Sequence, residues 1–226
     1  MLVYGDQFTG LNVRLAKDYI NPNDLAPMRD QLHVCESLFG DWKARVCLLM
    51  QDAADVASLR KFHAETGRPI LSHAPDVLTN KRLVKWLAKH EEFSRASIDG
   101  KHAKDCGIYY ANAVWFLKKS EGMSGALRQR RLVIQESQKV LGATLAQLNR
   151  LELIIAFGKT AYEALQARFQ VDTPWEKARE QKNLILHGRL LIGVTNHPVA
   201  RGVSEDWMEQ RLDNFLEQWR LRAKAA

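Results

Sequence analysis

The sequence predicts an α/β fold, a three-layer α/β/α sandwich with a mostly parallel, four-stranded central sheet. Short apolar runs alternate along the chain with longer stretches of helical spacing, which is typical of strands joined by crossover helices. The run from Val46 to Met50 is apolar at every position, so this strand should be buried on both faces, as in a parallel sheet covered by helices.

The composition favours one soluble domain. A chain of 226 residues, 46% hydrophobic and 26% charged, is long enough for one well-packed core, so we expect a single domain over residues 1–226. The net charge of +7 suits a polyanionic partner such as nucleic acid, or serves solubility alone. Three widely spaced cysteines support neither a disulfide framework nor a metal knuckle. With no secretory leader and no apolar run of about 18 residues, we expect a cytoplasmic monomer that binds no membrane.

The first half of the chain supplies one strand and three helices. The segment 21–24, Asn-Pro-Asn-Asp, starts a predicted helix that runs to Phe39. A second helix, Val56 to Glu65, follows the first strand, and a third, capped by Thr79, runs through Leu87. Residues 94–106 are polar and basic, so they are expected to form a surface loop.

The second half continues the alternation of strands and helices. A long helical stretch over 125–149 is predicted, either as one helix or as two helices broken at Gly142. Another helix should run to Phe169, and Ser204 should cap a final helix through Trp219. The remaining predicted strands are Ile108–Val114, Leu151–Phe157, Leu184–Leu186 and Leu190–Thr195.

Polar residues stand where three of these strands end. Gln51 and Asp52 follow the first strand, Asn112 stands near the end of the second, and His197 follows the last. Ligands of open α/β sheets usually bind in the crevice beyond the carboxyl ends of the strands. Each residue also has a purely structural explanation. Asp52 or its neighbour Asp55 would cap the next helix, Asn112 would be a buried amide, and His197 would be a turn residue.

Two basic features could bind phosphate. A strand, a glycine and a helix N-terminus form an anion site, and the sequence Gly158-Lys159-Thr160 has this arrangement. It is not a nucleotide-binding P-loop, because Leu153 stands where that motif needs a glycine. The second feature is an arginine cluster, which is either a solvated helix face or a phosphate contact: Arg128, Arg130 and Arg131.

Five segments, in the same order, resemble motifs of the uracil-DNA glycosylase superfamily. The first resembles a strand that ends in Gly-Gln-Asp-Pro or Gly-Glu-Ala-Pro-Gly, and the next a Gly-Arg-Pro-Phe segment of the iron–sulfur branch. The others resemble the strand of the base-reading Asn, a strand-Gly-helix segment and a His-Pro-Ser loop. These segments are Met50–Ala54, Gly67–Ile70, Ala111–Val114, Leu153–Ala161 and Asn196–Pro198.

The chain also departs from the family's motifs. Met50 replaces a Gly and Ala53 a Pro in the first motif, and Val199 replaces the Ser after His-Pro. Ile70 stands where the iron–sulfur branch has an aromatic residue. None of the cysteines matches a cluster ligand, so we expect a diverged member with no iron–sulfur cluster, no metal and no other cofactor.

The resemblance implies a uracil-DNA glycosylase-like fold and a role in base excision repair. Cleavage of an N-glycosidic bond develops positive charge on the sugar and negative charge on the base. The resemblance implies that Asp52 stabilises the charge on the sugar and His197 the charge on the base. A flipped base is read on its Watson–Crick edge, and the amide of Asn112 can both donate and accept. The expected substrate-binding residues are Gln51, Ile70 and Asn112, and the expected DNA-binding residues are Gly158, Lys159, Thr160 and Arg201.

Two alternatives to an active glycosylase stay open. The altered positions Ala53, Ile70 and Val199 favour a nucleic-acid-binding protein of the same family that has lost or changed the activity. A small-molecule enzyme such as a nucleotide hydrolase could use the same crevice.

Overall fold

The computed structural model describes residues 12–24, 40–52, 55–67, 78–93, 106–119 and 128–225. The predicted helix that ends at Phe39 lies outside these residues, as does most of the predicted loop over 94–106. Within the described segments, no helix combines the length and the apolar character needed to cross a bilayer.

The central sheet has five strands in the order β3-β2-β5-β7-β6. Four of them run parallel, and β6 pairs antiparallel with β7. The α/β class is confirmed, but the prediction of a mostly parallel sheet of four strands is wrong. The additional strand arises because β6 and β7 form a hairpin around Gly188, whose φ of 59° suits a tight turn, so the sheet is mixed. The strands are β2 Val46–Asp52, β3 Ile108–Val114, β5 Leu153–Phe157, β6 Ile185–His187 and β7 Leu190–Thr195.

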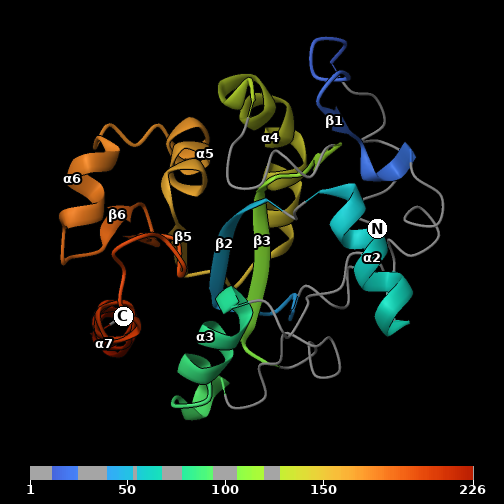
Figure 1. Cartoon of the computed structure of the whole chain (residues 1–226). Coiled ribbons are helices and arrows are strands. Elements are labelled where there is room, and N and C mark those ends of the chain that lie inside the picture. The colour runs from blue at the N-terminus through green and yellow to red at the C-terminus, as the bar shows by residue number, and fades with distance from the viewer. Residues whose placement is uncertain are drawn as a thin grey trace.

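Helices cover both faces of this sheet. One apolar cluster joins α4 and α5 to one face, and a second joins α3 and α7 to the other (Figure 1). Alternate residues of β2 separate into the two clusters, since Cys47 and Leu49 lie in the first and Val46 and Leu48 in the second. The helices are α2 Val56–Thr66, α3 Leu78–Leu87, α4 Arg130–Gln147, α5 Lys159–Phe169, α6 Trp175–Glu180 and α7 Glu205–Ala225.

A small second sheet lies beside the carboxyl ends of the central strands. Its strands β1 (Tyr19–Ile20) and β4 (Leu117–Lys118) pair antiparallel, with Tyr19 opposite Lys118. Lys118 also forms an isolated bridge with Asp55, just after β2. Short 3-10 turns are formed by Pro22–Asp24 and Glu91–Phe93. The small sheet therefore brings Lys118, which is remote in sequence, next to the exit of β2.

The structure decides one open alternative about helices and corrects one prediction. Helix α4 continues through Gly142 as one helix, and the guanidinium of Arg168 lies 3.1 Å from where a Cβ of that residue would stand. Thr79 does not cap α3, since it already lies within the helix. The Ser204 cap is confirmed, because its Oγ accepts a hydrogen bond of 3.1 Å from the backbone N–H of Trp207.

Candidate functional site

The exits of the parallel strands lie along one edge of the central sheet. Asp52 stands opposite Val114, and Asn112 pairs with the residue two positions before Asp52. On the other side of β2, strands β5 and β7 end together, and the backbone N–H of Gly158 donates to the carbonyl of Thr195 at 2.8 Å. The four parallel strands thus bring the polar residues predicted at their exits to the same edge.

The Asp52 carboxylate is held from two sides. Its Oδ1 lies 3.2 Å from Nζ of Lys118, and the two side chains are 8% and 4% exposed. Its Oδ2 accepts a hydrogen bond of 2.6 Å from the amide of Gln51. The amide oxygen of Gln51 in turn accepts a bond of 3.0 Å from the hydroxyl of Thr160, at the start of α5. This network fixes the orientation of Asp52 and compensates the burial of its charge.

Asp55, and not Asp52, caps helix α2. The side chain of Asp55 accepts hydrogen bonds from the backbone N–H of Ser58 at 2.8 Å and from its hydroxyl at 2.9 Å. The backbone of Asp55 is extended, as an N-cap residue requires. Of the two alternatives raised by the sequence, capping therefore belongs to Asp55, and capping does not explain Asp52.

His197 lies across the same edge, in the loop that follows β7. Burial lowers its pKa below the usual histidine value, and the nearby Asp52 carboxylate acts in the opposite direction. The ring nitrogen Nδ1 accepts a long hydrogen bond of 3.4 Å from the N–H of Val199, so in the neutral imidazole the proton is assigned to Nε2. His197 and Asp52 are thus electrostatic neighbours, and Nε2 is the nitrogen that can donate to a ligand.

A glycine whose backbone has a positive φ lies beside this histidine loop. Gly158 has a φ of 90°, and a Cβ added there would lie 3.7 Å from Cβ of His197. The helix that begins at Lys159 therefore starts immediately beside the histidine loop.

Asn112 is half-buried on β3, and its side-chain amide makes no hydrogen bond with the residues that the structure describes. Its amide carries one acceptor oxygen and two donor N–H groups. Ile70, the expected contact with the base, lies outside the described residues.

The residues expected to contact DNA differ in their surroundings. Thr160 is buried, with its hydroxyl directed at Gln51. Lys159 is exposed, with Nζ 3.6 Å from a carboxylate oxygen of Glu176. Arg201 is also exposed and forms no ion pair within the described part of the chain.

Sequence reasoning missed two members of this site, Lys118 and Tyr19. The Tyr19 phenol donates a hydrogen bond of 2.8 Å to the carbonyl of Arg128. Burial, followed by the charges of Asp18 and Asp52, raises the pKa of Tyr19 to about 12. Lys118 could have been noticed as a lysine directly after the apolar run 115–117, whereas nothing in the sequence marks Tyr19.

No His, Cys, Asp or Glu cluster suited to a metal ion occurs among the described residues. Cys47 and Cys106 are buried cysteines, and burial raises the pKa of both thiols. These two thiols are therefore poorly suited to nucleophilic chemistry.

No protein-family model matches this chain, and no curated protein matches it.

Proposed function

We propose that this protein is a DNA glycosylase that flips uracil, or a related damaged base, out of DNA and hydrolyses its N-glycosidic bond. The observation that carries the proposal is the placement of Asp52 and His197 at the ends of parallel strands, near enough for the carboxylate to affect the pKa of the imidazole. A carboxylate and a hydrogen-bond donor on one edge suit a reaction that separates a sugar cation from a base anion.

The two groups have complementary tasks in this reaction. As the bond breaks, the negative charge of Asp52 stabilises the positive charge that develops on the sugar. Asp52 also orients the attacking water. Because its pKa is lowered by burial, His197 is neutral at pH 7, and its Nε2–H donates to the oxygen of the departing base. A neutral imidazole donates a hydrogen bond without adding a positive charge of its own to the site.

Asn112 supplies the recognition step. Its amide presents one acceptor and two donors, which can pair with the carbonyl and N–H groups of uracil. A base inside a duplex is out of reach, so the nucleotide must first be extruded from the stack. The lack of any hydrogen bond to its side chain within the described residues supports this role.

A specific observation favours the second candidate, a nucleic-acid-binding protein without glycosylase activity. Each oxygen of Asp52 already has a protein partner, Lys118 on one side and Gln51 on the other. A carboxylate that is 8% exposed and doubly engaged has less capacity to orient water. The glycosylase requires that Asp52 contact the bound substrate, whereas the binding protein does not.

The test is single-turnover release of base from an oligonucleotide that contains one uracil, with the thymine oligonucleotide of the same sequence as control. The glycosylase proposal predicts release from the uracil strand alone. His197→Ala should slow it by roughly a hundred- to a thousand-fold, because one donor to the leaving oxygen is lost. His187→Ala is the matched control, since His187 is exposed on β6. Absence of release by the wild type would favour the binding protein.

A further inference from the structure

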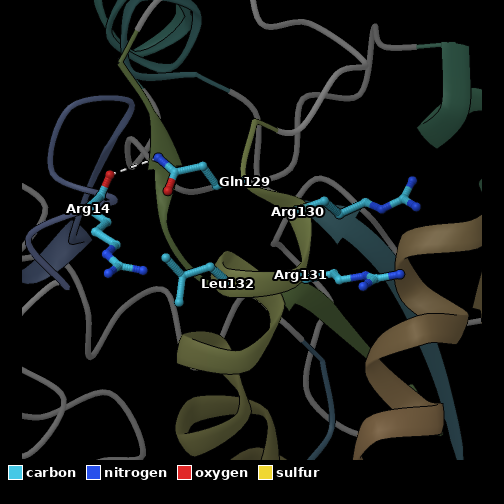
Figure 2. Close-up of a pocket in the computed structure, with 5 residues that line it drawn as sticks. All are labelled: Arg14, Gln129, Arg130, Arg131 and Leu132. Carbon is cyan, nitrogen blue, oxygen red and sulfur yellow. Dashed lines mark hydrogen bonds between the residues drawn. The ribbon is translucent and has the colours of Figure 1, made fainter.

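A basic cavity of about 530 Å³ opens beside the candidate site, at the N-terminal turn of α4 (Figure 2). We call it the arginine pocket, and none of the described residues that line it is acidic. Its lining residues are Arg14, Gln129, Arg130, Arg131 and Leu132.

The arginine pocket lies at the same edge of the sheet as Asp52. Ser137, on the second turn of α4, accepts a hydrogen bond of 3.1 Å from the N–H of Trp115, directly after β3 ends. Tyr19 spans the remaining distance, because its hydroxyl bonds the carbonyl of Arg128 while the charge of Asp52 contributes to its raised pKa. The pocket and Asp52 therefore lie at the same end of the sheet, with Tyr19 between them.

Two of the arginines are available to an external anion. Arg128, beside the pocket, pairs with Asp18 at 3.1 Å, and Arg130 pairs with Glu163 at 3.0 Å. Arg14 and Arg131 are exposed, and neither forms an ion pair within the described segments. Because neither guanidinium is engaged by a carboxylate there, both can offer their N–H groups to phosphate oxygens.

The arginines are spread along the pocket. Figure 2 shows Arg130 and Arg131 extending toward α5, with Arg14 on the other side of the helix turn. Between them, the amide of Gln129 donates to the carbonyl of Arg14 at 2.8 Å, which ties the two walls together. Guanidinium groups that do not converge suit a ligand with several separated charges better than a single small ion.

We infer that the arginine pocket binds the sugar–phosphate backbone of the nucleic-acid strand next to the nucleotide held at Asp52. The choice of nucleic acid rests on the proposed function. The charge, the location and the spacing of the arginines are observed in the pocket and do not depend on that proposal. The salt dependence of DNA binding measures the phosphate contacts whether or not the protein has glycosylase activity.

A second arginine-rimmed cavity, at the opposite edge, provides a matched control. It lies at the amino ends of the strands, and it contains the carboxylate of Glu152, which Arg45 binds through two hydrogen bonds of 2.8 and 2.7 Å. A carboxylate in the lining opposes a phosphate ligand. Arg189 and Arg222 also line this cavity and are exposed, so they allow the same charge change far from Asp52.

The experiment measures binding of a fluorescent, uracil-free single-stranded DNA by anisotropy over a range of salt concentrations. The double variant Arg14→Gln/Arg131→Gln is compared with Arg189→Gln/Arg222→Gln. Each phosphate contact that is lost should reduce the slope of log affinity against log salt by about 0.7, so the pocket variant should lose about 1.4. The control variant should keep the wild-type slope, and both variants should melt like the wild type.

A strand with uncharged methylphosphonate linkages extends the test. It should bind the wild type and the pocket variant equally, because its backbone offers the arginines no charge. An equal or larger loss in the control variant, or no binding of DNA by the wild type, would overturn the inference. Wild-type binding that depends on the pocket, together with no release of uracil, would instead contradict only the glycosylase proposal.

Discussion

Lys118 and Asp52 form a nearly buried ion pair, with Nζ of the lysine 3.2 Å from Oδ1 of the aspartate. The two residues are far apart in the sequence, and β4 brings Lys118 to the exit of β2. The pair therefore links the small sheet to the candidate site.

Breaking this pair from the lysine side should destabilise the fold. Lys118→Met keeps the length of the side chain but leaves the Asp52 carboxylate buried without its cation, and such a change typically costs about 3–5 kcal/mol. Urea unfolding measures the loss. Lys61→Met is the control, because the Lys61–Glu65 pair is 75% and 62% exposed and should contribute at most about 0.5 kcal/mol. Equal losses in the two variants would contradict a stabilising role for the buried pair.

The cap of α2 gives a second prediction. Asp55→Ala removes the acceptor for the Ser58 N–H and should cost about 1 kcal/mol in the free energy of unfolding, whereas Asp55→Asn should retain most of the stability. Urea denaturation of both variants tests this. If Ala and Asn destabilise equally, the loss comes from the charge of Asp55 and not from capping.

His197 should make stability depend on pH. Its pKa is lowered in the folded protein, by burial above all, so between the folded value and the ordinary value of about 6.5 the unfolded chain binds more protons. The contribution of His197 is therefore fully present above about pH 6.5 and is lost as the pH falls through the folded pKa. Thermal melts of the wild type and His197→Gln from pH 5 to 8 should converge at the acid end. A constant difference across this range would contradict the lowered pKa.

The sequence could predict the central strands because their signal is local. Ile108–Val114 and Leu190–Thr195 are found at the predicted bounds, because the first is rich in β-forming residues and the second is a mostly apolar run that ends before Asn196. Asp52, Asn112 and His197 could be placed at strand exits for the same reason. Parallel pairing alone then brings them to one edge.

The other features of the fold and the site depend on contacts between residues that are distant in the sequence, which a local sequence pattern does not reveal. Gly142 has a low helix propensity, yet α4 continues through it, and the guanidinium of Arg168 packs close to the space that a Cβ would fill. Tyr19 and Lys118 reach the site through pairing of β1 with β4, across about a hundred residues of chain. The position of Lys118 next to Asp52 therefore needed the structure.

Single-turnover release of uracil by the wild type and by Asp52→Asn tests the central claim most directly. The substitution keeps the shape and polarity of the side chain and removes its negative charge, so the rate should fall by about a hundredfold or more. Binding to the uracil strand, measured on the same folded sample, should persist or improve. Because Asp55 caps α2, a loss of helix capping cannot account for a slower rate. Equal rates for the two proteins would contradict a catalytic role for Asp52.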